Sequence, residues 1–358
     1  TNLYLAWWLG HDGRCAYVLG DQGGNEIGHL IAVDLRGDRP PVDLTPDLDP
    51  YTNRGVGLSL GGAGLVLSVI YEGDYRVYHL ADPAAPEPAP RLLARYRQPA
   101  TGSRLSADGT VATMDLTIPD PAGDRSTVQV LRVADGEPLR RYRDEDASHV
   151  NGHLFSPRPG DPTVVVTTNR TGVRRPVLWQ VDDDDRRPLV VGDLPGDVLP
   201  LDWSGDGRQL LLCHSWRAEQ QLFRYDLATD RIEPLAVPAG AYHDELIPAG
   251  GAQFGPDGSV LVAVESMAKP VTVYRHQPGP GGSTTTVLDS AAPVGTPARS
   301  VDFRSDDGTL VQGWFATPEG IGPFPTLIRV HGARTTSNAT PMTRGRRSGW
   351  TTGTPTSG

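Results

Sequence analysis

The feature that most constrains the fold of this chain is a short turn signal that recurs about every fifty residues. The signal joins a small polar residue to Asp-Gly, as in Ser106-Ala107-Asp108-Gly109 and Ser204-Gly205-Asp206-Gly207. Asp-Gly suits the positive φ angles of a tight turn, and a Ser or Asp side chain can bond to the turn backbone. The turn glycines, separated by intervals of 47 to 51 residues, are Gly13, Gly62, Gly109, Gly160, Gly207, Gly258 and Gly308.

Each signal is followed by two runs of residues that suit β-strands. In the fourth unit these runs are TVVVTT (163–168) and PVLWQVD (176–182). A shorter run precedes each signal, and a weak fourth strand closes most units. Four short strands per repeat of about fifty residues, with no helical period between them, are typical of a β-propeller blade. The sequence therefore predicts an all-β fold, a propeller with six four-stranded blades visible within residues 1–298.

Composition agrees with this fold class and excludes others. The chain of 358 residues contains 42 Gly and 33 Pro, which argues against helix bundles and coiled coils. Its 43 acidic residues outnumber 33 basic ones, so we expect no nucleic-acid partner. No apolar run approaches the ~18 residues of a membrane span, and we see no secretory leader. We expect a cytoplasmic protein in which Cys15 and Cys213 are buried free thiols.

The pattern changes at residue 299, after the last complete blade. The relevant residues are Asp307-Gly308, Gly313-Trp314, Pro318, the apolar run 326–330 and His331-Gly332. This segment resembles the one through which the propeller of prolyl oligopeptidase-family serine peptidases leads into an α/β-hydrolase domain. The first repeat unit is similar to an early blade of the acylaminoacyl-peptidase branch. The resemblance implies that 299–332 are the first strands of a hydrolase domain, and that the parent propeller has a seventh blade, lost or incomplete at the N-terminus.

The same resemblance predicts part of a catalytic site. In such peptidases a glycine-rich loop after a buried strand aims backbone N–H groups at the oxyanion. His331, Gly332 and Ala333 correspond to that loop, although the family has a second glycine where this chain has Ala333. The nucleophilic Ser, the Asp and the His follow later in this fold, yet the 26 residues after Gly332 contain no Asp, Glu or His. We therefore predict no catalytic residue and no activity in this chain.

The resemblance implies a function for the parent enzyme. Its propeller would gate a serine peptidase of acylaminoacyl- or dipeptidyl-peptidase type, which cleaves short peptides from their N-terminus. No cofactor and no metal are expected, the partners are short peptide substrates, and the oligomeric state is open. The alternative is a non-enzymatic TolB-like propeller that binds a protein or peptide, because TolB-like blades carry similar Ser-x-Asp-Gly turns.

Three local patterns resemble active or metal sites. Gly57-Leu58-Ser59-Leu60-Gly61 matches G-x-S-x-G, but a strand-forming run follows it, whereas a nucleophile elbow needs a helix there. Ser59 is therefore predicted to be a turn serine. His149 and His153 have an i, i+4 spacing that brings two ligands together only on a helix, and the intervening Gly152 favours a loop that enters a strand. The acidic run 182–185 is expected to be a solvated hairpin loop.

The remaining features concern the core and the end of the chain. Residues 333–358 contain no Leu, Ile, Val, Phe or Tyr and cannot build a core. We interpret them as a disordered basic tail or as the product of a one-base frameshift after His331-Gly332, since a shifted frame can restore HGGPH. Six tryptophans fall at strand positions and are expected to pack between blades: Trp7, Trp8, Trp179, Trp203, Trp216 and Trp314.

Overall fold

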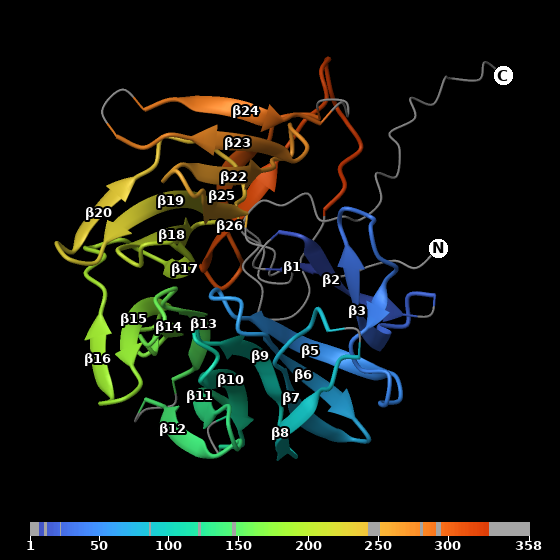
Figure 1. Ribbon diagram of the computed structural model, residues 1–358. Coiled ribbons are helices and arrows are strands. Elements are labelled where there is room, and N and C mark those ends of the chain that lie inside the picture. The colour runs from blue at the N-terminus through green and yellow to red at the C-terminus, as the bar shows by residue number, and fades with distance from the viewer. Residues whose placement is uncertain are drawn as a thin grey trace.

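All regular structure in the described part of the protein is β. The computed structural model describes residues 7–10, 13–21, 23–85, 87–120, 123–144, 148–242, 251–279, 282–290 and 295–328. Within these ranges there are 26 strands and no helix, so no described segment forms a membrane-spanning helix. Six blades are arranged around a common centre (Figure 1), and the predicted all-β propeller is confirmed.

The first two blades share one sheet of eight strands. Their strands are β1 (Trp7–Leu9), β2 (Cys15–Asp21), β3 (Ile27–Asp34), β4 (Val42–Asp43), β5 (Tyr51–Leu58), β6 (Leu65–Tyr71), β7 (Asp74–Leu80) and β8 (Arg91–Tyr96). The link between the blades is short, because β3 pairs with β5 only at Ile27–Thr52 and Gly28–Tyr51. Elsewhere each strand pairs with its neighbours in sequence, as the hairpin turns require.

Blades 3 to 6 are separate antiparallel sheets of four strands each. Blade 3 comprises β9 (Ala100–Leu105), β10 (Val111–Ile118), β11 (Arg125–Arg132) and β12 (Pro138–Tyr142). Blade 4 comprises β13 (Val150–Phe155), β14 (Thr163–Thr168), β15 (Arg175–Gln180) and β16 (Asp185–Pro188). Blade 5 comprises β17 (Asp197–Trp203), β18 (Gln209–Trp216), β19 (Glu219–Asp226) and β20 (Arg231–Pro234). Blade 6 comprises β21 (Ala252–Phe254), β22 (Val260–Val264), β23 (Thr272–His276) and β24 (Thr284–Leu288).

The hydrophobic core is divided among the spaces between neighbouring blades. Five buried apolar clusters are found, one between each successive pair of the six blades. Side chains of a strand alternate between its two faces, so each middle blade contributes to two clusters. Between blades 3 and 4, for example, the fully buried Trp179 meets Tyr142 edge-on, with 5.3 Å between ring centroids. Apolar packing therefore holds each blade against the next.

The repeated turn signals also connect the blades. All seven turn glycines have positive φ angles, from +65° at Gly13 to +84° at Gly308, as the Asp-Gly pattern predicts. Successive turns then touch one another. The joining hydrogen bonds are Ser59 Oγ to Ala107 O (2.8 Å), Gly160 N to Asp108 Oδ2 (3.2 Å) and Arg158 Nε to Asp206 O (2.8 Å). The signal is thus both a hairpin turn and a contact between blades along one rim.

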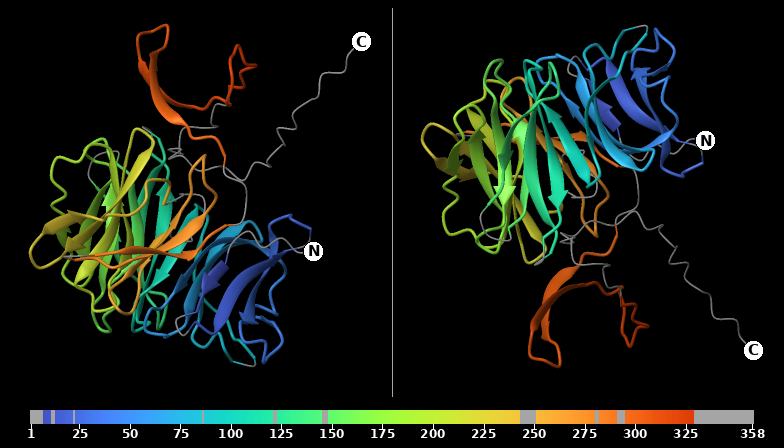
Figure 2. Two further views of the ribbon diagram at one scale, coloured as in Figure 1. Left: turned by 90° about the horizontal axis from the view of Figure 1, so that it is seen from above. Right: turned by 90° about the horizontal axis from the view of Figure 1, so that it is seen from below.

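The last two strands form a hairpin outside the six blades. β25 (Arg299–Arg304) pairs with β26 (Leu310–Phe315), and this hairpin stands clear of the propeller body (Figure 2). Its contact with the body includes an ion pair between Asp302 and Arg217 of the β18–β19 turn. Further along, the strand predicted at 326–330 is absent from its described part, 326–328, where Leu327 and Ile328 are each 83% exposed. A strand needs a paired neighbour, and no described segment pairs with these residues.

Candidate functional site

The centre of the propeller is lined by the first strands of successive blades. β5, β9, β13, β17 and β21 contact one another in this order around the ring (Figure 1). Four of them carry a β-bulge, because the register against the second strand shifts in each. The bulged positions recur at the spacing of the repeat: Arg54, Gly102–Ser103, His153 and Leu201. A bulge re-aims side chains and is common beside active sites, so this inner wall is the first candidate site.

Glycines bring the inner strands of blades 2 and 3 into backbone contact. A Cβ atom on Gly57 would lie 2.5 Å from the Cα of Arg104, and one on Gly55 would lie 2.9 Å from Gly102 N. Neither position can accept a larger residue without a backbone shift. Two glycines inside a strand-like run are a known signal of close backbone approach, and that signal was present in the sequence at residues 55–57.

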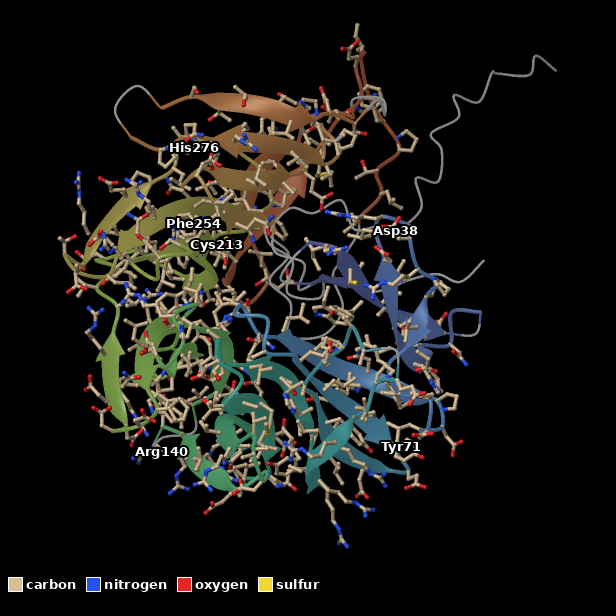
Figure 3. The ribbon with its side chains drawn as sticks, in the orientation of Figure 1. Asp38, Tyr71, Arg140, Cys213, Phe254 and His276 are labelled. Carbon is tan, nitrogen blue, oxygen red and sulfur yellow. The ribbon has the colours of Figure 1, made fainter. Side chains whose placement is uncertain are left out.

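Two half-buried carboxylates at or beside the inner wall bond to the next blade: Asp202 on β17, and Asp115 on β10, the second strand of blade 3. In blade 3, Asp115 Oδ1 accepts a hydrogen bond from Gly152 N of blade 4 (2.8 Å). In blade 5, Asp202 Oδ2 accepts one from Phe254 N of blade 6 (2.7 Å), a residue labelled in Figure 3. Burial raises the pKa of each carboxyl to about 6, although these hydrogen bonds act in the opposite direction. Both groups therefore titrate close to neutral pH, and nothing in the local sequence distinguishes them from surface aspartates.

The same wall carries two arginines without a carboxylate partner. Arg104 is half-buried and donates from Nε to His153 O (2.5 Å) and from Nη1 to Ser103 O (2.9 Å). Burial lowers its pKa, and the charge of Asp115 opposes that effect. Arg54 is exposed and forms no hydrogen bond or ion pair with any residue that the structure describes. The wall thus carries arginines as well as carboxylates.

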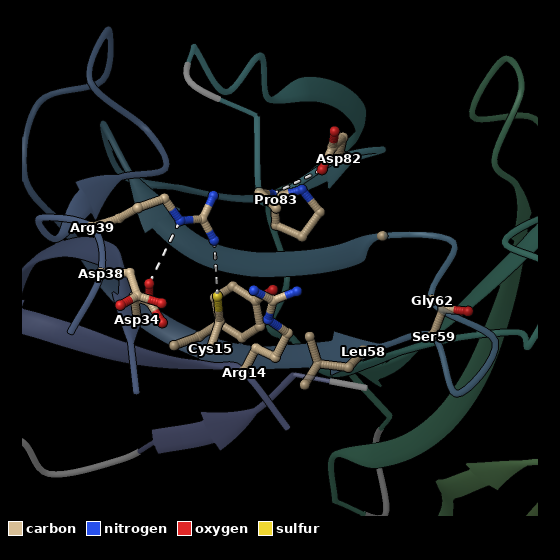
Figure 4. A pocket seen from close by; sticks show the side chains of 13 residues that line it. Arg14, Cys15, Asp34, Asp38, Arg39, Leu58, Ser59, Gly62, Asp82 and Pro83 are labelled. Atoms are coloured by element: carbon tan, nitrogen blue, oxygen red, sulfur yellow. Dashed lines mark hydrogen bonds and ion pairs between the residues drawn. The ribbon is translucent and has the colours of Figure 1, made fainter. Parts of the chain in front are cut away.

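A second candidate is a pocket of about 640 Å³ between blades 1 and 2 (Figure 4). Arg39 lies along it, with Nε 3.6 Å from a carboxylate oxygen of Asp34 and Nη2 3.9 Å from Cys15 Sγ. The backbone N–H of Arg36 is the main cause of the lowered pKa of Asp34. Because Arg39 of this pocket pairs with Asp34, its charge is already partly neutralised.

Ser59 also borders this pocket, and its geometry is that of a turn residue. Its side chain is 1% exposed, and its Oγ donates to Ala107 O of the next blade. The residues after it form the turn into β6, which is a strand, and a nucleophile elbow requires a helix there. The predicted assignment as a blade-turn serine is confirmed.

His149, His153 and the acidic run form hydrogen bonds to nearby residues of the fold. His149 Nδ1 accepts from Ser126 N (3.2 Å), while His153 Nε2 bonds to Thr167 Oγ1 (2.8 Å) on β14. In the turn between β15 and β16, Asp184 Oδ1 accepts from the indole N–H of Trp179 (2.7 Å), as in a closed hairpin loop. Among the described residues, no group of three or more His, Cys, Asp or Glu side chains could hold a metal ion.

The cysteines agree with prediction, and two tryptophans do not. Cys15 and Cys213 are free and buried, and burial raises the pKa of Cys213, which lies in blade 5 (Figure 3), to about 12. Trp179 and Trp203 are buried, but Trp216 is 48% exposed at the end of β18. Trp314 lies on β26, in the hairpin outside the six blades, so packing between blades was the wrong prediction for both Trp216 and Trp314. The predicted loop residues His331, Gly332 and Ala333, and the tail 333–358, lie outside the described residues.

Comparison with known proteins shows a likeness in fold. No protein-family model and no curated protein matches the sequence. A structure from a study of two prolyl endopeptidases matches 87% of this chain and 46% of its own, with a TM-score of 0.64 and 14% identity. A puromycin-hydrolysing peptidase from Mycobacterium tuberculosis matches 86% of this chain and 50% of its own (TM-score 0.60, 17% identity). Prolyl oligopeptidase B from Galerina marginata matches 86% and 45% (TM-score 0.61, 11% identity).

The fold resembles the propeller of prolyl oligopeptidase-family peptidases. This chain spans about half the length of the solved structures it matches. The shared part is the propeller fold, which at these identities does not by itself carry over an activity.

Proposed function

We propose that this chain forms the propeller of a serine peptidase of the prolyl oligopeptidase family, of acylaminoacyl- or dipeptidyl-peptidase type. The observation that carries the proposal is the fold match over 86–87% of the chain to peptidases about twice as long. In such a protein the propeller selects substrates, and a separate α/β-hydrolase domain forms and hydrolyses the acyl-enzyme. The segment 299–332, which resembles the start of that domain, supports the same proposal.

The inner wall suits a gate for short, extended peptides. Five apolar clusters hold the six blades together, so the wall is a rigid surface rather than a flexible loop. The wall carries charged side chains, including Asp115 and Arg104, together with strand backbone. A short extended peptide brings charged ends and unpaired backbone groups, which charged side chains and strand backbone can bind.

The test combines gene sequence with enzymology. DNA beyond codon 332 is read in all three frames, and any hydrolase coding sequence is joined in frame to this chain. We expect the chain alone to show no turnover of acylaminoacyl- or dipeptidyl-p-nitroanilides and no labelling by a fluorophosphonate. The restored protein should hydrolyse one of the two substrates, and should cleave octapeptides but not an unfolded 60-residue polypeptide.

Two results would contradict the proposal. If no frame encodes a hydrolase, the alternative of a non-enzymatic propeller that binds a protein or peptide is favoured. If the restored enzyme cleaves long and short chains equally well, the propeller does not select by size.

A further inference from the structure

The β25–β26 hairpin has one polar anchor on the propeller body. Within the part of the chain that the structure describes, the hydrogen bonds and ion pairs of β25 and β26 stay inside the hairpin, with one exception. The exception is Asp302 of β25, which pairs with Arg217 of blade 5. The two strands form a sheet of their own, and no described strand of the blades pairs with them (Figure 2). The position of the hairpin on the body therefore depends strongly on this pair.

The turn that carries Arg217 has little freedom to redirect it. Strands β18 and β19 stay paired up to Trp216 and Glu219. Arg217 and Ala218 alone form the turn, with φ angles of +52° and +59°. In the matching turn of blade 2, between β6 and β7, the second position is Gly73. A residue with a Cβ atom adopts a positive φ at some cost, but it has fewer alternative conformations than glycine. Ala218 therefore fixes the direction in which the turn presents Arg217.

The ion pair itself is of a kind that breaks easily. The side chains of Arg217 and Asp302 are 43% and 39% exposed. Exposed ion pairs contribute little to stability and are screened by salt. The hydrogen bond to Asp302 is the main cause of the raised pKa of Arg217, and the charge of Glu219 acts in the same direction. Arg217 thus has a second carboxylate nearby when Asp302 leaves.

The hairpin face that bears Asp302 also contains an unsatisfied donor. Asp302 lies opposite Gln312, and alternation along β26 places Trp314 on the same face. The indole Nε1 of Trp314 is buried and has no hydrogen-bond partner. A buried donor without an acceptor destabilises the arrangement that contains it. The observed position of the hairpin therefore combines a weak anchor with an unmade hydrogen bond.

We propose that the β25–β26 hairpin alternates between two positions, and that the Arg217–Asp302 ion pair is a salt-sensitive latch that holds the position seen here. In the released position the pair is broken, Arg217 pairs with Glu219, and the indole N–H of Trp314 reaches water. After β26 the chain continues into the segment that resembles the start of a hydrolase domain. The latch then also sets the orientation of that domain, and this consequence alone rests on the proposed function.

The experiment measures the position of the hairpin in the purified chain by double electron–electron resonance between two spin labels. The labels are attached through Asp306→Cys in the β25–β26 turn and Ala228→Cys in the β19–β20 turn of blade 5, both exposed positions. The native Cys15 and Cys213 are buried, so they compete little for the label. At about 0.01 M NaCl, where the Debye length is about 30 Å, we expect one dominant distance; at about 1 M, where it is about 3 Å, a second distance should appear.

Variants test whether the ion pair is responsible. Arg217→Gln and Asp302→Asn should each lower the ratio of latched to released hairpin by a factor of about two to five at low salt. Arg217→Asp should lower this ratio further, because two carboxylates then face each other, and the additional change Asp302→Arg should restore it. Glu219→Gln is the matched control: it removes a carboxylate beside Arg217 but keeps the pair with Asp302. It should leave the latched population unchanged or larger.

The outcomes separate the latch from the proposed function. If the distances do not respond to salt or to Arg217→Gln, or if the charge-swapped double variant does not restore them, there is no latch. In the restored protein, Arg217→Gln should change peptide turnover without changing the melting temperature. If the distances change in this chain but turnover does not, the latch stands and its coupling to the hydrolase domain is refuted. If no reading frame encodes a hydrolase, the proposed function fails while the spin-label result still decides whether the latch exists.

Discussion

Replacing Asp202 by Asn should make the protein more stable at pH 8 and leave it nearly unchanged at pH 4. The carboxyl of Asp202 has a pKa of about 6 in the folded protein because of burial, against about 3.9 in an unfolded chain. The folded state therefore binds this proton more tightly. The protonated carboxyl therefore contributes to the free energy of unfolding; this contribution is fully present below pH 4 and is lost as the pH rises through 6. Two pKa units correspond to about 3 kcal/mol of unfolding free energy at pH 8.

Asparagine removes the charge but keeps an oxygen that can accept the hydrogen bond from Phe254 N. Its amide adds donors that need partners, so we expect a gain of about 1–3 kcal/mol at pH 8. Urea unfolding followed by tryptophan fluorescence measures this gain, and Trp203, which is adjacent and 6% exposed, is a local reporter. Comparing variant and wild type at each pH cancels the titration of all other groups.

The control variant, Asp206→Asn, should change the stability at pH 8 in the opposite direction. Asp206 Oδ1 accepts from Ser204 Oγ (2.7 Å) and Arg208 N (3.0 Å), and these bonds lower its pKa. Asp206→Asn should therefore reduce stability at pH 8, with the loss fading as the pH falls below 4. If Asp202→Asn shifts the urea midpoint by the same amount at pH 4 and pH 8, the buried charge is not the cause and the reasoning is refuted.

Three further predictions concern the turns and a thiol. Gly207→Ala should lower the free energy of unfolding by about 1–3 kcal/mol, because φ is +67° and the new Cβ would lie 2.7 Å from Arg158 Nε. The control is Gly205→Ala in the same turn, where the new Cβ meets open space. Equal urea midpoints for the two variants would contradict this prediction. Ser59→Ala should lower stability by about 1–3 kcal/mol through the lost bond to the next blade, and fluorophosphonate labelling of wild-type Ser59 would overturn its assignment as a turn residue. Cys213 should react with Ellman's reagent only after unfolding, since it is buried and its pKa is about 12. If mass spectrometry detects fast reaction of Cys213 in the native protein, blades 5 and 6 must open.

The propeller fold could be inferred from sequence because its signals are local. A turn glycine requires a positive φ angle whatever surrounds it, and all seven predicted turn glycines have one. Alternation of apolar residues along a strand likewise depends on only a few neighbouring positions. The described part of the apolar run, 326–328, forms no strand, because a strand also needs a partner and no described segment pairs with it.

The candidate site could not be predicted in the same way, since each of its features depends on residues far along the chain. Asp115 and Asp202 have raised pKa values only because neighbouring strands bury them, and their acceptor bonds reach backbone 37 and 52 residues away. Gly55 and Gly102 lie far apart in the sequence, yet their backbones touch where β5 packs against β9. The sequence alone thus determined the repeat, the strands and the turns, because their physics is settled within a few residues. Tertiary structure alone decided which charges are buried, which are unpaired and which face the centre, because burial and pairing arise only when blades pack against each other.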